Sequence, residues 1–462
     1  MRQNADFCEK CAKSAVLCIK NQSKSYIRNS FIKKTITTML VQFKFNNFKC
    51  FKDETLLNLV ASNYFKEESD NLISTPFYSV VKTVAVYGAN ASGKTKLFLA
   101  FDFMRDVILH SANNVNSNIW QQKYDPFRLN IQSREASSSF ETVFIIDGIQ
   151  YRYGFELDKT QIHTEWLFRK KTKEINVFYR DEEGIEYNSV YVNKKIAETL
   201  KDAKMVRDNA LFLSALSLWN DTTASLISNW FYESNILSTS IDNYMGFSLN
   251  RLDSPMKSNI LSLMQEADIG IEDIRANEVP IENVPDEVKR LLPKEAILGK
   301  IYNGVKTLHK VYDENHLPVG REEFTLEVDE SYGTVKFFAL SAPIIDTLQK
   351  GKRLFVDEID HGLHFDLLVA LIRLFNSPKT NPYNAQLIIN THNVGLLDEG
   401  IFRRDQIYIT SKNSYGEAIL KSITDFSKLK LRKDSKIGDL YRDGKLGGVP
   451  YLAEFGLSLE SK

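Results

Sequence analysis

The octapeptide from Gly88 to Thr95 has the residue types and the spacing of a loop that binds nucleotide phosphates. It reads Gly-Ala-Asn-Ala-Ser-Gly-Lys-Thr and follows the apolar run 84–87, so it stands where a buried strand ends and a helix begins. In such a loop the glycines allow backbone N–H groups to point into one concavity that cradles an anion. We expect Lys94 to reach the terminal phosphates and the Thr95 hydroxyl to hold Mg²⁺.

The whole loop is therefore predicted to bind the nucleotide, and Lys94 is also predicted to be catalytic. The nucleotide-binding residues are Gly88, Ala89, Asn90, Ala91, Ser92, Gly93, Lys94 and Thr95. We expect the Lys94 side chain to lie on an exposed loop, so that replacing it removes a charge and leaves core packing intact. The cofactors implied are ATP and Mg²⁺.

Two carboxylates follow a second apolar run, 354–356. A nucleotide hydrolase needs one carboxylate in the Mg²⁺ shell and a second one to orient the attacking water. We assign Asp357 to the metal and Glu358 to the water. Taken alone, the segment could equally be a strand followed by an acidic turn without a catalytic role.

A third apolar run, 387–389, ends in Asn390-Thr391-His392. A histidine just beyond a buried strand can hydrogen-bond the γ-phosphate and report its loss, although a histidine in such a place is more often structural. We assign His392 to catalysis because the three segments occur together.

The order of these segments resembles that of ATP-binding-cassette (ABC) type ATPases, such as the heads of chromosome-maintenance and recombination proteins. Those ATPases carry a Ser/Gly-containing signature at a helix start, shortly before the strand with the two carboxylates. The signature contacts the γ-phosphate held by the opposite subunit. The segment 330–334, Glu-Ser-Tyr-Gly-Thr, occupies that position. The resemblance implies that Ser331 and Gly333 bind the nucleotide of a second copy, and a helix N-terminus is a natural anion site.

From about Met39 to Pro450 the chain also resembles the ABC-type ATPases of bacterial abortive-infection and OLD (overcoming lysogenization defect) systems. The segments that carry this resemblance are Asn47–Phe51, Gly88–Thr95, Glu330–Thr334, Asp357–His364, Thr391–Asn393 and the glycine-rich Tyr441–Pro450. Two positions depart from the family pattern, with Tyr332 where Asp is frequent and Phe365 where Pro is usual. Gln121 and Gln122 are the candidates for the glutamine that contacts Mg²⁺ in such ATPases.

The elements that must position these residues alternate between strand and helix. A strand pattern starts at Met39, with Val41, Phe43 and Phe45 on one face. Turn residues divide 138–180 into two hairpins in series, which predicts an antiparallel sheet beside the nucleotide core. The stretch 190–275 is predicted to be helical, and strands are predicted again at 307–312 and 323–328.

We therefore predict an α/β fold of the P-loop NTPase class, an ABC-ATPase head with an antiparallel β subdomain and a helical insertion. The predicted parts are a basic extension (1–38), a first ATPase lobe (39–189), a helical insertion (190–300) and a second lobe (301–462). The extension holds eight Lys or Arg against two acidic residues. It is expected to be a flexible arm or a stretch upstream of a natural start at Met39, with contact to nucleic acid as the alternative.

The composition excludes few functions. Lys and Arg number 59, as do Asp and Glu, so the net charge of zero gives no support for general nucleic-acid or membrane affinity. No apolar run approaches the roughly 20 residues of a membrane-spanning helix, and no signal-peptide core is visible, so we expect a cytoplasmic protein without a membrane partner. Cys8, Cys11 and Cys18 have partial zinc-ligand spacing, but reduced thiols are the preferred interpretation.

Three functions fit these motifs. The first is an ATPase, converting ATP and water to ADP and phosphate, whose dimerisation controls an effector in anti-phage defence. The second is a DNA-repair or recombination ATPase that clamps DNA, but such proteins usually need long coiled coils or a strongly basic surface. The third is an OLD nuclease with a fused Toprim domain, for which the 70 residues after His392, without an Asp-x-Asp pair, are expected to be too short.

We prefer the first function. The expected partners are a second copy in a head-to-tail, ATP-dependent dimer or higher homo-oligomer, an effector nuclease or toxin encoded nearby, and a phage-encoded trigger. The ATPase subunit of PARIS-type systems, which works with a separate Toprim effector, matches best in size and layout. Septu-type systems, with an HNH nuclease partner, are the alternative within that class.

Overall fold

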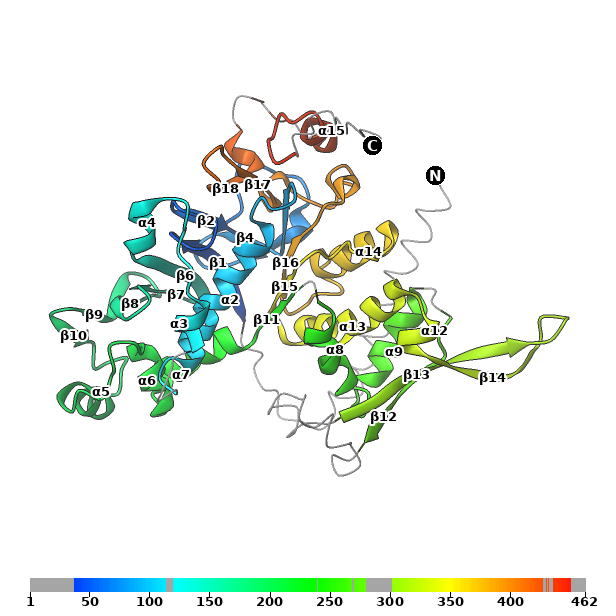
Figure 1. Ribbon diagram of the computed structural model, residues 1–462, viewed down its shortest axis with the longest axis horizontal. Coiled ribbons are helices and arrows are strands. Elements are labelled where there is room, and N and C mark those ends of the chain that lie inside the picture. The colour runs from blue at the N-terminus through cyan, green and yellow to red at the C-terminus, as the bar shows by residue number, and fades with distance from the viewer. Residues whose placement is uncertain are drawn as a thin grey trace, which may run out of the picture. The chain divides into compact units, whose positions relative to one another are not determined.

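A computed structural model describes residues 37–113, 119–238, 240–267, 270–279, 301–426, 429, 431 and 435–449 (Figure 1). The described residues form two compact units. We call 38–234 together with 388–449 the P-loop unit, and 235–387 the signature unit. Cys8, Cys11, Cys18, Pro450 and almost all of the basic extension lie outside the described residues. The four predicted parts of the chain remain predictions.

The P-loop unit contains a seven-stranded antiparallel sheet with the order β10-β9-β8-β7-β6-β1-β2. Its strands are β1 (Thr38–Phe45), β2 (Thr55–Asn58), β6 (Ser138–Ile146), β7 (Ile149–Leu157), β8 (Ile162–Lys170), β9 (Glu174–Asp181) and β10 (Gly184–Tyr187). The predicted hairpins are confirmed, and Asp147 and Gly148 form the first turn with φ of 48° and 74°. The predicted inner face of β1 is confirmed as well, because Val41, Phe43 and Phe45 are all buried.

The same unit holds the strand that leads into the phosphate loop. In this unit β5 (Thr83–Gly88) runs parallel to β17 (Ile407–Lys412), and β17 runs antiparallel to β18 (Ala418–Ser422). Every residue of β5 is buried, which explains its apolar sequence. Helix α2 (Lys94–His110) follows the loop and packs on β1, where Phe101 meets Phe43 edge to face at 5.2 Å.

Shorter elements complete the P-loop unit. They are η1 (Ser69–Asn71), β3 (Leu72–Ser74), β4 (Ser79–Val81), α3 (Ile119–Lys123), α4 (Ile131–Glu135), α5 (Lys194–Asp202), α6 (Phe212–Leu218), α7 (Thr222–Tyr232), η3 (Val394–Leu397), η4 (Arg404–Gln406), η5 (Ile423–Asp425) and α15 (Ile437–Arg442). Strand β16 (Gln386–Asn390) contains the boundary between the two units, which falls after Leu387.

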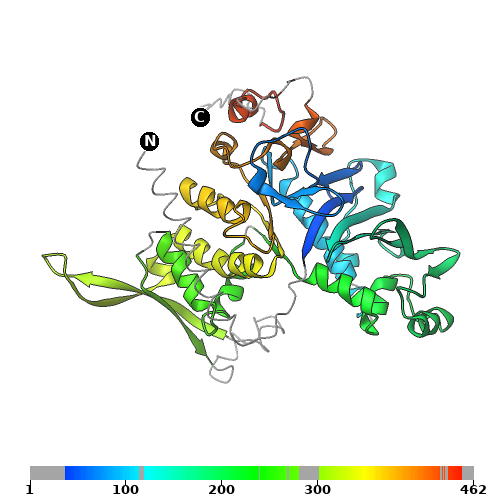
Figure 2. The same ribbon diagram turned by 180° about the vertical axis from the view of Figure 1, so that it is seen from behind.

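The signature unit is built around α13 (Tyr332–Lys350), which is buried along most of its length. Helices α8 (Asp242–Leu249) and α9 (Lys257–Glu266) pack against it, as both views show (Figure 1, Figure 2). The other elements are β11 (Ser234–Leu237), whose first residue belongs to the P-loop unit, α12 (Leu326–Asp329), β15 (Arg353–Val356), α14 (Phe365–Asn376) and the sheet of β12 (Asp273–Val279), β13 (Ile301–Tyr312) and β14 (Pro318–Thr325). Strands β13 and β14 continue beyond the last pair that β12 makes, Asp273 with Leu308, as a two-stranded ribbon.

The helical prediction for 190–275 is confirmed for α5 to α9, but β11 and the start of β12 were not expected there. The predicted strand at 323–328 is only half right, because β14 ends at Thr325 and α12 begins at Leu326. The Asp329 carboxylate accepts a hydrogen bond from the Thr325 N–H at 2.6 Å, which closes a helical turn. Within the described ranges, none of the helices combines the length and the apolar character needed to cross a bilayer.

Candidate nucleotide-binding site

The phosphate loop connects the end of β5 to the start of α2, as the sequence predicts. Gly88, Ala91 and Gly93 have positive φ values of 155°, 60° and 118°. Residues of this kind turn successive N–H groups toward one centre and form an anion-binding concavity. Because α2 begins at Lys94, directly after Gly93, the dipole of its first turn adds to the attraction for phosphate.

Thr410 holds the loop from the neighbouring strand, and the sequence analysis missed it. Thr410 pairs with Gly88 across β17 and β5, and its hydroxyl donates to the Tyr87 carbonyl at 3.1 Å. The Ser92 hydroxyl therefore donates to Thr410 Oγ1, 2.6 Å away. A Cβ on Gly88 would lie 2.5 Å from the Thr410 carbonyl oxygen, so only glycine fits at this position.

Lys94 does not lie on an exposed loop, so that expectation is wrong. Its side chain is only 6% exposed, because Lys94 begins α2 and turns inward. The ammonium Nζ donates to the carbonyl oxygens of Gly88 at 2.9 Å and Ala89 at 3.1 Å. The ammonium is thus held at the loop itself, where its positive charge adds to the attraction for a phosphate.

The two carboxylates follow β15, as the sequence predicts. Asp357 is 3% exposed, and its N–H donates to the carbonyl of Leu237, the last residue of β11, at 2.9 Å. Glu358 is partly exposed and has a φ of 48°, which is uncommon for a residue with a Cβ. Such a conformation costs free energy and is retained where surrounding contacts enforce it, often at a functional site.

One of those contacts comes from Lys336, a residue that the sequence analysis did not single out. Lys336 lies on α13, is 1% exposed, and donates from Nζ to the Glu358 carbonyl at 2.7 Å. Burial lowers the pKa of the Lys336 ammonium to about 8, although the carboxylates of Asp360, Glu358 and Asp357 favour the charged form. Lys336 thereby joins the helix of the Ser/Gly segment to the turn that carries the catalytic candidates.

The Ser/Gly segment begins α13, and the expected helix start at Ser331 is confirmed. Ser331 is the N-cap residue, and its Oγ accepts from the Thr334 N–H at 3.1 Å. A Cβ on Gly333 would lie 2.5 Å from the Gly362 carbonyl oxygen. Tyr332, at the position where the family often has Asp, contacts His361 with the rings tilted by 46° and their centroids 5.2 Å apart. The start of α13 therefore packs on the turn that follows the two carboxylates.

His392 follows β16 in an exposed position. The preceding Thr391 is buried, and its N–H donates to the Val86 carbonyl of β5 at 3.2 Å. His392 thus comes directly after a residue that hydrogen-bonds the strand leading into the phosphate loop.

The predicted site residues gather in two places. The P-loop unit holds the loop from Gly88 to Thr95 and His392. The signature unit holds Ser331, Gly333, Asp357 and Glu358. Gln121, one of the two glutamine candidates, lies on α3 and donates to the carbonyls of Lys159 and Thr160 at 3.0 and 3.3 Å. Both bonds use the amide nitrogen, whereas Mg²⁺ would be bound by the amide oxygen.

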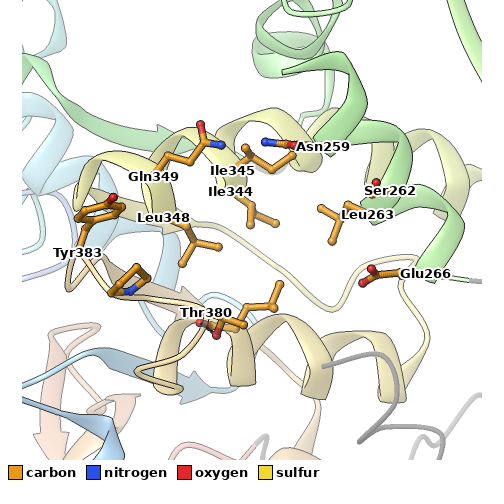
Figure 3. A pocket seen from close by; sticks show the side chains of 12 residues that line it. Asn259, Ser262, Leu263, Glu266, Ile344, Ile345, Leu348, Gln349, Thr380 and Tyr383 are labelled. Carbon is orange, nitrogen blue, oxygen red and sulfur yellow. Dashed lines mark hydrogen bonds between the residues drawn. The ribbon is translucent and has the colours of Figure 1, made fainter. Parts of the chain in front are cut away.

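An apolar cavity of about 50 Å³ lies elsewhere in the signature unit, among α9, α13 and α14 (Figure 3). None of the predicted site residues lines it. Its one carboxylate is Glu266, and burial raises the pKa of that group to about 7. The cavity lacks cationic side chains and is too small for a nucleotide, so we do not assign it to the ATP site.

The fold and the site define an α/β P-loop ATPase with its motifs in the order of ABC ATPases. The family model "AAA domain, putative AbiEii toxin, Type IV TA system" matches residues 84–398, well over half of the sequence, and the chain belongs to this family. The chain is accordingly an enzyme that hydrolyses ATP to ADP and phosphate. The search of curated proteins returns no match.

Several solved structures are similar to the chain at low identity. The SMC head bound to the C-winged helix domain of ScpA is 13% identical, with 85% of this chain and 99% of that chain covered and a TM-score of 0.40. The SMC head domain from Thermotoga maritima is 13% identical, with 83% of this chain and 98% of that chain covered and a TM-score of 0.36. The recombination mediator protein RecF is 10% identical, with 83% of this chain and 98% of that chain covered and a TM-score of 0.30.

Proposed function

We propose that the chain is the ATPase subunit of an anti-phage, abortive-infection system in the cytoplasm and controls a separate effector nuclease or toxin. The observation that carries this proposal is the membership of a family whose description names an AbiEii toxin and a type IV toxin–antitoxin system. ATP hydrolysis alone does not stop a virus, so the output must come from a partner that the ATPase holds or releases.

In the proposed reaction, the loop from Gly88 to Thr95 would bind the triphosphate, and Thr95 and Asp357 would hold Mg²⁺, which would neutralise charge on the phosphates. Glu358 orients the attacking water, and His392 contacts the γ-phosphate. Three observations support these roles. The loop has an anion-binding backbone, Lys94 carries its charge at that loop, and the Glu358 turn is held in an uncommon conformation.

The proposed active assembly is a head-to-tail dimer, or a higher oligomer built from it. Ser331 and Gly333 of one copy would meet the γ-phosphate bound by the loop of another copy. The support for this is the start of α13, where Ser331 is exposed at the positive end of a helix of 19 residues. A symmetric pair of copies makes two such sites.

The binding role of the loop is tested with Lys94→Met, which keeps most of the buried volume and removes the charge. We expect the variant to stay folded and to lose detectable ATP binding in a titration. Lys96→Met, a neighbouring exposed lysine on α2, is the matched control and should bind ATP as the wild type does. Wild-type affinity in Lys94→Met would contradict the assignment of the loop.

The defence role is tested with the native operon. We propose a Toprim effector of the PARIS type, with the HNH partner of Septu-type systems as the other outcome, and a phage protein as trigger. The effector encoded next door should co-purify with the ATPase, and phage protection should need both genes. Protection by the ATPase gene alone would refute the two-component proposal. ATPase activity stimulated by DNA, without any effector, would instead favour a DNA-repair ATPase.

A further inference from the structure

The glycine-rich segment after α15 packs against the phosphate loop. Tyr441, on α15, is 7% exposed, and its hydroxyl donates to the Gly448 carbonyl at 2.9 Å. Its ring lies 6.0 Å, centroid to centroid, from the ring of Tyr87, the residue just before the loop. Burial raises the pKa of the Tyr441 phenol, so the hydroxyl stays protonated and able to donate.

Gly448 makes the closest approach of this segment to the loop. Its φ is 73°, and a Cβ there would lie 2.5 Å from Ile409 Cγ2 and 3.0 Å from the Thr410 carbonyl oxygen. The same Cβ would lie 3.4 Å from Gly88 Cα. A side chain is therefore excluded both by the backbone conformation and by the space available.

These contacts meet at Thr410, which the loop already uses. Thr410 accepts from the Ser92 hydroxyl on one side, while its backbone carbonyl faces Gly448 on the other. The loop needs such support, because three of its residues have a positive φ. One of them is Ala91, whose Cβ makes a positive φ unfavourable. Tyr441, Gly448 and Thr410 form one continuous buttress behind the loop.

We propose that Tyr441 and Gly448 are positioning residues for ATP, which hold the phosphate loop in the conformation that receives the phosphates without touching the nucleotide themselves. This inference rests on the proposed role of Gly88–Lys94 in nucleotide binding. A loop that is only partly populated in its binding conformation binds more weakly by that fraction. Loosening the buttress should thus weaken ATP binding and leave the chemical step of bound ATP almost unchanged.

The test compares Tyr441→Phe with Tyr408→Phe. Tyr408 is a matched control because it is 5% exposed and donates to a backbone carbonyl, that of Asn58, at 2.7 Å, away from the loop. We expect Tyr441→Phe to raise the Kd for ATP roughly threefold to tenfold, the effect of losing one hydrogen bond. Its kcat at saturating ATP should stay within about twofold of the wild type, and Tyr408→Phe should have the wild-type Kd.

Gly448→Ala is the stronger variant and should weaken ATP binding further if it folds. The thermal midpoint of each variant without nucleotide separates a local effect on the loop from general destabilisation. An unchanged Kd in Tyr441→Phe, or an equal rise in Tyr408→Phe, would overturn the inference. Lys94→Met separates this outcome from failure of the proposed function. If both Lys94→Met and Tyr441→Phe bind ATP normally, the assignment of the loop is wrong. If Lys94→Met loses ATP binding while Tyr441→Phe binds normally, only the supporting role of Tyr441 is refuted.

Discussion

At the scale of single residues, the catalytic candidates are supported by groups that are distant in the sequence. Glu358 has its φ of 48° in a turn that receives the Lys336 ammonium on its carbonyl oxygen. The position of the Glu358 carboxylate therefore depends on α13 as well as on the strand before it. Two substitutions separate the chemistry of the carboxylate from the support of the turn.

The first is Glu358→Gln, which keeps the shape of the side chain and removes its ability to take a proton. We expect ATP to bind normally and to be hydrolysed about 10²–10⁴ times more slowly, the usual range for a lost general base. Single-turnover hydrolysis and equilibrium ATP binding measure the two quantities. If turnover were unchanged while Asp357→Asn was inactive, the roles of the two carboxylates would have been misassigned.

The second is Lys336→Met, which keeps the packing of a long side chain and removes the hydrogen bond to Glu358. We expect a lower kcat with little change in the Kd for ATP, because the loss displaces the turn and leaves the phosphate loop untouched. Lys350→Met, on the same helix but paired with Asp346, serves as the control and should keep its kcat. Equal losses in both variants would mean that any lysine on α13 has the same effect.

At the scale of elements, the start of α13 combines two duties in Ser331. The side chain caps the helix now, and it is proposed to contact a phosphate of a second copy. Ser331→Asp separates these duties, because aspartate is a good N-cap residue but would repel a phosphate. We expect stability close to the wild type and loss of the ATP-dependent dimer, measured by chemical unfolding and by sedimentation with ATP in the Glu358→Gln background.

Ser331→Ala is the complementary variant and should lose about 1 kcal/mol of unfolding free energy with the cap. If Ser331→Asp dimerised normally with ATP, Ser331 would be a helix cap and nothing more.

The cavity among α9, α13 and α14 allows a test by pH. The pKa of Glu266 is about 7 in the folded protein and 4.5 in the reference state. As the pH rises through 4.5, Glu266 ionises in the unfolded chain but stays protonated in the folded protein. The free energy of unfolding therefore falls progressively until the pH reaches about 7. Glu266→Gln should raise the thermal midpoint at pH 8 and change it little at pH 4.5. An equal change at both pH values would show that the carboxyl is not protonated in the folded state.

At the scale of the whole molecule, the proposed assembly predicts complementation between subunits. A mixed dimer contains one Lys94→Met copy and one Ser331→Asp copy. One of its two sites then carries both substitutions, and the other site carries neither and is intact. Each variant alone should be inactive, and the mixture should recover at most one working site per dimer. ATPase activity of the mixture against protein concentration measures this. Full activity from strictly monomeric wild-type protein would exclude the head-to-tail arrangement.

The sequence by itself determined the chemistry, the order of the motifs and most strands and helices near them. These features are local: a phosphate loop needs eight consecutive residues after a strand, and the acidic pair needs only the apolar run before it. The alternation in β1 and the turns at 138–180 are local as well, because side chains on a strand alternate between its two faces. Even the capping role of Ser331 depends on a residue only three positions away.

Only the tertiary structure decided what supports those motifs. Ser92 and Thr410 are 318 residues apart and share a hydrogen bond, and Lys336 reaches Glu358 from another element. Gly448 likewise packs on Gly88 and on Thr410 of β17, the strand that pairs in parallel with β5. No local sequence pattern predicts such contacts, because the residues around a buried lysine or threonine show the same spacing as those around an exposed one. Their effect arises only when chain folding removes water from both partners at once.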